Sequence, residues 1–137
     1  MLKLNYENIS PNLQKSFQYK IHNAQHPNIN NLNWHYHQEI ELVYIDKGNG
    51  KRGVGTHLSN YVDGDLILLG SNLHHMGFTD HFEDGKTEVV VQFLPAFLGS
   101  AFSVAPEFAP IVKLFENAKR GLSFPEPIKT RVGEALL

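Results

Sequence analysis

The sequence predicts an all-β sandwich or barrel followed by helices, and three observations support this prediction. Short runs rich in β-branched and aromatic residues (EIELVYI, YVDGDLILL, TEVVVQF) recur between about residue 34 and residue 93. Turn signals rich in Gly, Asp and Asn (KGNGK, VDGD, GSN) separate these runs. After residue 93, the apolar residues take up helical spacing instead. The runs lie too close together for crossover helices, which argues against a parallel α/β sheet.

The strands can be placed in order along this pattern. Residues 17–21 alternate apolar and polar side chains, which predicts a strand beyond a polar, turn-rich N-terminal arm. Further strands are expected over 34–45 and 64–69, with GSNL as a turn and His75 opening the next strand. We therefore expect an antiparallel barrel over about residues 15–93.

Helices are expected at the C-terminal end of the chain. The clearest helix should follow Pro110, because apolar residues recur there at i, i+3, i+4 and i+7, namely Ile111, Leu114, Phe115 and Ala118. Such a stripe should pack against the outside of the barrel. Residues 95–102 predict a shorter helix. Residues 129–137 begin another helix, and its apolar positions have too little chain after them to complete a packing face. We therefore expect the chain to be a piece of a longer protein.

The composition excludes several classes of protein. The 137 residues carry a net charge of −2, include no cysteine, and are 42% hydrophobic and 19% charged. These values predict one globular domain, and the lack of cysteine excludes a disulfide framework, a zinc ribbon and a thiol nucleophile. Lys and Arg are scattered, so this segment offers no basic face for nucleic acid. Without a signal-peptide pattern or a run of about 18 apolar residues, we expect a cytoplasmic protein with no membrane contact.

Histidine is the unusual residue, because four of the eight histidines form two tight pairs, His35/His37 and His74/His75. His35, His37 and Glu41 lie at odd spacing on one predicted strand, so their side chains should point to the same face. Two imidazoles and a carboxylate on one face form the kind of set that holds Ni, Zn, Mn or Fe(II). The sequence therefore offers a site for a divalent first-row metal.

Three further residues bear on this site. Parity also places Glu39 on the same face, which requires either a bulge or a position near a mouth of the barrel. The hairpin after residue 69 should bring His75 across from His35 and His37, which makes His75 a fourth candidate ligand. The adjacent His74 is the alternative, because the sequence does not decide which of the two faces inward.

The neighbours of this motif are expected to have other roles. Trp34 and Tyr36 alternate with the histidines, so they should face the opposite side and serve as packing residues. Arg52 lies just beyond a tight turn and is expected to be a solvated charge.

Two motifs of the cupins occur in the chain. The first, HxH(x)3E(x)6G, is met in full by His35, His37, Glu41 and Gly48. The second, G(x)5PxG(x)2H, is matched at its ends by Gly64 and His75. Its interior departs, with Gly70 where Pro is usual and Asn72 where Gly is usual. The chain resembles the cupins in these motifs, which implies a double-stranded β-helix, or jelly-roll barrel.

A narrower resemblance covers roughly residues 30–137. The segments WHYHQEIELVYIDKGNGKR, DGDLILLGSNLHH, EVVVQF and AKRGLSF are similar, in order and interval, to the sensor domain of AraC-family transcriptional regulators. The resemblance implies an effector-binding barrel with its N-terminal arm over 1–105. It also implies a helical segment over 106–137 that leads to a dimerisation and helix-turn-helix part absent from this chain.

On this resemblance, the barrel binds a small-molecule effector, such as a sugar or related metabolite. DNA would be contacted only through the missing C-terminal part, and the protein would be a homodimer. A regulator is therefore the expected function, and no enzyme activity is expected. The alternative is a metal-dependent cupin enzyme, a dioxygenase or sugar isomerase, which needs imidazoles and a carboxylate around an open coordination position.

The chemistry of the site stays open at this stage. The set consists of His35, His37, Glu41 and His75. It can hold a metal, it can form hydrogen bonds directly to an organic ligand, or it can form a hydrogen-bonded belt that closes one end of the fold.

Overall fold

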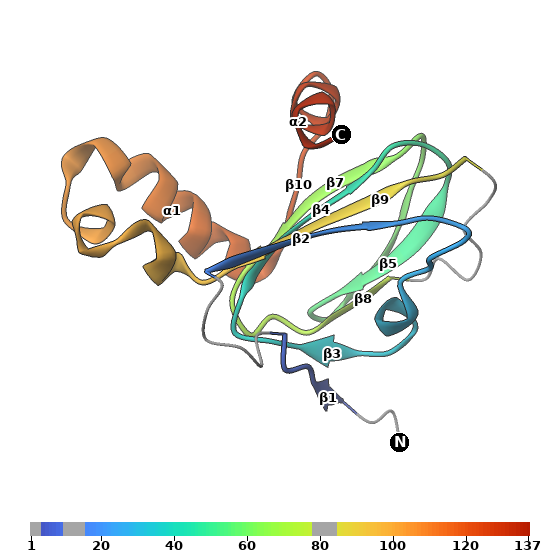
Figure 1. The fold of residues 1–137 in the computed structure, drawn as a ribbon, viewed down its shortest axis with the longest axis horizontal. Helices are drawn as coiled ribbons and strands as arrows, with labels where there is room; N and C mark the ends of the chain where they lie inside the picture. The colour runs from blue at the N-terminus through green and yellow to red at the C-terminus, as the bar shows by residue number, and fades with distance from the viewer. Residues whose placement is uncertain (1–3, 10–15, 78–84) are drawn as a thin grey trace.

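The computed structural model describes residues 4–9, 16–77 and 85–137, which form two five-stranded sheets and a set of C-terminal helices (Figure 1). The first sheet has the order β1-β3-β8-β5-β6, and the second has the order β10-β7-β4-β9-β2. The strands are β1 (Asn5–Tyr6), β2 (Phe17–His22), β3 (His35–Tyr36), β4 (Ile40–Ile45), β5 (Gly50–Val54), β6 (His57–Tyr61), β7 (Asp65–Leu69), β8 (His75–Gly77), β9 (Glu88–Phe93) and β10 (Leu122–Ser123). The chain is therefore mostly β, with the jelly-roll barrel of the cupin type and the C-terminal helices that the sequence predicts.

Most of the helical segments follow β9. The two α-helices are α1 (Ala109–Asn117) and α2 (Ile128–Leu136). Short 3-10 turns are η1 (Ile29–Leu32), η2 (Pro95–Leu98), η3 (Ser100–Ser103), η4 (Pro106–Phe108) and η5 (Ala118–Arg120). The single helix predicted over 95–102 is wrong, because Gly99 divides this segment into the two turns η2 and η3. Within the described residues, no helix has the length and apolar character needed to cross a membrane.

The second sheet is buried on both faces at its central strands β4, β7 and β9, which explains why these three strands are largely apolar runs. Its inner face joins the interior core, which consists of Val43, Ile45, Tyr61, Ile67 and Leu69. On its outer face, Leu114 and Phe115 of α1 pack against Ile40 and Leu68, as the predicted stripe requires. Val132 and Leu136 of α2 pack on a second outer cluster, Tyr44, Leu66 and Val89. The last helix therefore has a packing face in Val132 and Leu136, whereas the terminal Leu137 is 65% exposed.

The strand predicted over 34–45 is in fact two strands in different sheets. β3 pairs with β1 and β8, whereas β4 pairs with β7 and β9. The chain bends at residues 38–39 between them. Glu39 therefore lies at a corner where the chain passes from one sheet to the other, which is why simple alternation does not describe its position.

Candidate functional site

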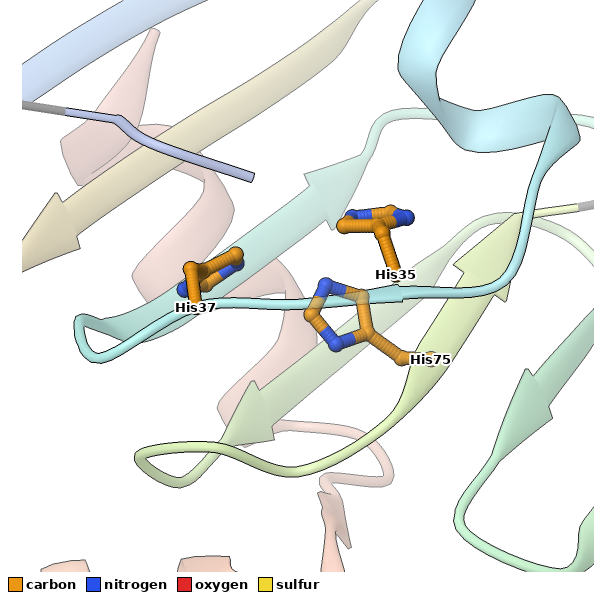
Figure 2. Close-up of side chains that lie close together, drawn as sticks. All are labelled: His35, His37 and His75. Atoms are coloured by element: carbon orange, nitrogen blue, oxygen red, sulfur yellow. The ribbon is translucent and has the colours of Figure 1, made fainter. Parts of the chain in front are cut away.

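Three buried histidines converge in the interior of the barrel (Figure 2). His35 and His75 lie opposite each other across the β3–β8 pair, and their ring centroids are 4.2 Å apart. His37 follows at the corner after β3, with its ring centroid 5.0 Å from that of His75. One ring nitrogen from each histidine lies within 4.8 Å of the other two. The structure thus brings His75 across from His35 and His37, as the hairpin pattern predicts.

A backbone carbonyl fixes the orientation of each of the three rings. Each Nδ1 lies 2.7–3.0 Å from a backbone carbonyl oxygen two residues away in the chain; the carbonyls are those of Asn33, Glu39 and Leu73. Because a carbonyl oxygen only accepts, each Nδ1 carries a hydrogen, and Nε2 is the ring nitrogen left for a ligand. Metal-binding histidines use this arrangement, with the second ring nitrogen held by a backbone or carboxylate oxygen.

Glu41 of β4 supplies a carboxylate to the same site. Its Oε2 accepts hydrogen bonds from His37 Nε2 at 3.0 Å and from Gln92 Nε2 at 2.7 Å. Burial opposes ionisation of Glu41, but the His37 hydrogen bond and the histidine charges outweigh it and lower the pKa of Glu41 to about 2. Burial also opposes protonation of His37, but the hydrogen bond to Glu41 outweighs it and raises the pKa of His37. When His37 carries a proton on Nε2, that proton lies between His37 and Glu41. A metal cation could take the place of this proton.

Two buried polar atoms beside Glu41 have no hydrogen-bond partner among the described residues, His75 Nε2 and Gln92 Oε1. Burial lowers the pKa of His75 to about 4 against the attraction of Glu41, whose Oε1 lies 3.7 Å away. His75 is thus neutral near pH 7 and keeps an unused lone pair on Nε2. Buried acceptors without a donor are rare in proteins, and a bound cation would satisfy this one. Three imidazoles and a carboxylate fit a divalent first-row metal.

A small polar cavity of about 90 Å³ reaches this cluster. His35, Glu41 and Gln92 line it, together with Glu7 from the N-terminal arm. Glu7 Oε2 lies 3.6 Å from His35 Nε2, a contact that no pattern in the sequence around Glu7 signals. The volume leaves room for an ion with a few waters, but not for a sugar.

The structure places the remaining candidates outside the three-histidine cluster. His74 is exposed, and its ring packs on that of Tyr36 with 5.3 Å between centroids, so it lies on the outer surface. Glu39 is buried, and its carboxylate lies 3.8 Å from His37 Nδ1, the nitrogen that the backbone already holds.

No protein-family model matches the chain, and no curated protein matches it. Among solved structures, an apo ToxT variant from Vibrio cholerae matches with a TM-score of 0.52 and 17% identity, over 89% of this chain and 47% of that one. ToxT bound to (E)-4-(8-methylnaphthalen-1-yl)but-3-enoic acid matches with a TM-score of 0.48 at the same identity. This chain is similar in fold to about half of ToxT. At this identity the likeness shows the fold alone, and the chain spans about half the length of the structures that it matches.

The turn between β7 and β8 explains why the second cupin motif departs from its usual form. Gly70 N–H donates to the carbonyl of Ala118 at 2.8 Å, and a Cβ on Gly70 would lie 2.6 Å from Lys119 N. A proline here would lose that hydrogen bond and clash with η5. Asn72 has a φ of 60°, the left-handed conformation that glycine usually supplies, and its N–H donates to the carbonyl of His37 at 2.7 Å. Both departures therefore fit the turn that leads into β8.

Two interior contacts differ from, or go beyond, what the sequence predicts. Arg52 is not a solvated charge, because its Nη1 donates to Asp65 Oδ2 at 2.6 Å and its Nη2 donates to Ser123 Oγ at 3.3 Å. Burial raises the pKa of Asp65 although Arg52 lies beside it. Gln92 holds Glu41 through a hydrogen bond that the sequence does not predict. The sequence does mark Gln92 as unusual, because it is a polar residue within the apolar run EVVVQF.

Proposed function

We propose that this chain is the ligand-sensing domain of an AraC-type transcription regulator, and that it holds a divalent first-row metal. The metal ligands would be His35, His37 and His75, with Glu41 as the carboxylate. The convergence of three buried imidazoles, with no hydrogen-bond partner for His75 Nε2 among the described residues, is the observation that carries the metal site. The motif resemblance and the fold of ToxT support the regulator.

The domain organisation is part of the same proposal. The barrel and its arm over 1–105 would bind the effector, and the segment over 106–137 would lead to dimerisation and helix-turn-helix units. ToxT is solved with an organic acid bound, which supports a small-molecule effector for this chain as well. The regulator would act in the cytoplasm as a homodimer.

Each residue of the cluster has a defined task in this proposal. The backbone carbonyls fix the three rings with Nε2 available, and Gln92 orients the Glu41 carboxylate. When bound, the metal would supply an open coordination position to which a small ligand can add. A bound cation would displace the proton of His37, whose pKa is raised, so affinity for the metal should increase as the pH rises above the ordinary histidine pKa of 6.5.

Metal analysis tests the site directly. Protein purified without an affinity tag should contain a stoichiometric first-row metal, or should take up one equivalent of Ni, Zn, Mn or Fe(II) in a calorimetric titration. Protein that takes up none of these metals would remove the coordination role and leave hydrogen bonding to an organic ligand. The regulator is tested separately by the reading frame, which should continue into two helix-turn-helix patterns.

A metal-dependent cupin enzyme is the second candidate, because the first cupin motif is intact and its donors converge. The ToxT structure that matches this chain with a TM-score of 0.52 is that of a regulator, which favours the first proposal. Turnover of a substrate by the metal-loaded chain, in place of simple binding, would favour the enzyme.

A further inference from the structure

A second, larger cavity of about 490 Å³ opens between the sheets and contains no residue of the histidine cluster. Val54, Leu69 and Leu73 line it and also belong to, or pack against, the apolar core of the barrel. Ile67 of β7, the β5–β6 hairpin and residues 119–123 form the rest of its wall. Small-molecule sites usually measure roughly 300–1,000 Å³, so this cavity has the size of a binding site.

The wall of this cavity is positively charged. Its charged residues are Arg52, Lys119 and Arg120, and no carboxylate lines it among the described residues. Asp65 offsets the charge of Arg52, but Lys119 and Arg120 are exposed and make no ion pair with any described residue. The imidazole of His57 and the hydroxyl groups of Thr56, Ser59 and Ser123 complete the polar part of the wall.

The turn that carries the two unpaired cations is fixed to the barrel at several points. The carbonyl of Ala118 accepts the Gly70 N–H bond, and β10 pairs with β7 directly after the turn. Gly121 has a φ of 76°, and a Cβ there would lie 2.6 Å from Val54 Cγ1, so the turn lies directly on β5. Arg52 also reaches across the cavity wall to Ser123 Oγ. Such fixed positions reduce the entropy lost when a ligand binds.

We infer that this cavity binds a small organic anion, with its acidic group at Lys119 and Arg120 and its apolar body against Val54, Leu69 and Leu73. Ammonium and guanidinium groups form strong charge-assisted hydrogen bonds with carboxylates. A sugar fits the wall less well, because its uncharged hydroxyls leave the charges of Lys119 and Arg120 without a counter-charge. That this anion is the effector rests on the proposed function as a regulator. That the anion binds to the chain does not rest on it.

A matched pair of probes tests this inference on the 137-residue chain itself. Naphthalene-2-carboxylate and naphthalene-2-carboxamide have the same apolar body and differ in charge. In calorimetric titrations the acid should bind at least about tenfold more tightly than the amide, because only the acid meets the two cations. In the double variant Lys119→Gln, Arg120→Gln, affinity for the acid should fall by at least about tenfold, and affinity for the amide should not change.

Two control variants separate this site from its surroundings. Lys113→Gln removes an exposed cation of α1 that does not line the cavity, and it should leave affinity for the acid unchanged. His74→Ala removes an exposed ring on the outer surface that does not line the cavity, and it should also leave affinity for the acid unchanged. Equal affinity for acid and amide, no binding of the acid, or full affinity in the double variant overturns the inference. Because no DNA enters the experiment, failure of the regulator proposal does not affect this result.

Discussion

The histidine cluster and the cation-lined cavity lie in the same barrel and are built in opposite ways. His35, His37 and His75 are at most 5% exposed, and each has one nitrogen held by a backbone carbonyl. Lys119 and Arg120 are exposed and keep their charges unpaired among the described residues. Buried polar groups need partners at close range, whereas exposed charges act over a Debye length of about 8–10 Å. The cluster is therefore suited to a small cation, and the cavity to a larger anion.

Removal of one imidazole should have the largest effect and should be confined to the cluster. His75→Ala removes the nitrogen without a partner, so zinc affinity should fall by more than about 100-fold, beyond the loss typical of outer-shell changes. Isothermal titration with zinc measures this. His74→Ala is the matched control, because His74 lies on the outer surface, and it should change zinc affinity by less than about twofold. Similar losses in the two variants would contradict the assignment of His75.

Acid should destabilise the metal-free protein through the cluster. Unfolded His75 takes up a proton near its ordinary pKa of 6.5, but folded His75 does so only near 4, beside His35, His37 and Glu41. Between these values the unfolded state binds more protons, so stability falls as the pH falls. From pH 6.5 to 4.5, His75 alone should cost on the order of 2 kcal/mol, measured by urea unfolding.

Two other groups act outside this pH window. Glu41, with a pKa of about 2, adds its own loss of stability as the pH falls below 4.5. Because the pKa of His37 is raised, His37 lowers the stability of the folded protein as the pH rises above 6.5, and not as the pH falls. His75→Gln should therefore flatten the slope between pH 6.5 and 4.5, whereas the exposed control His57→Gln should not. The same slope in both variants would show that other groups cause the acid loss.

Gly121→Ala should disturb the cation-lined cavity and spare the cluster. The residue combines a positive φ with contact to Val54, so the substitution should cost about 1–3 kcal/mol, observed as a lower Tm. Gly55→Ala is the control, because Gly55 also has a positive φ but its nearest neighbouring atom would be 3.7 Å away. Its cost should be smaller, at about 1 kcal/mol. Equal costs would mean that the contact with Val54 contributes nothing.

Salt should have the smallest effect and should distinguish the two probes. An increase in NaCl from 50 to 500 mM screens the exposed cations, so naphthalene-2-carboxylate should bind roughly threefold more weakly. Naphthalene-2-carboxamide has no charge and should bind equally at both concentrations. Equal salt sensitivity of acid and amide would show that charge does not govern the cavity.

The sequence predicts the cluster better than the cavity, for a physical reason. His35, His37 and Glu41 are close in the chain, so local spacing suffices to group them, and one hairpin adds His75. The corner at residues 38–39 is not predictable in this way, because alternation assumes a single strand.

The cavity depends on contacts between segments that are distant in the chain. Arg52 meets Asp65 and Ser123 only after the two sheets are assembled. In the sequence, Lys119 and Arg120 directly follow the helical stripe that ends at Ala118, and basic residues are common at the end of a helix for another reason, the helix dipole.

The turn at residues 70–73 also determines how two amide groups exchange with solvent. Gly70 N–H is bonded to the carbonyl of Ala118 and Asn72 N–H to that of His37, so both should exchange deuterium slowly although neither lies in a strand. Each amide reports on a different neighbour. Faster exchange at Gly70 with Asn72 still protected would show that η5 separates from the barrel while the histidine corner stays in place.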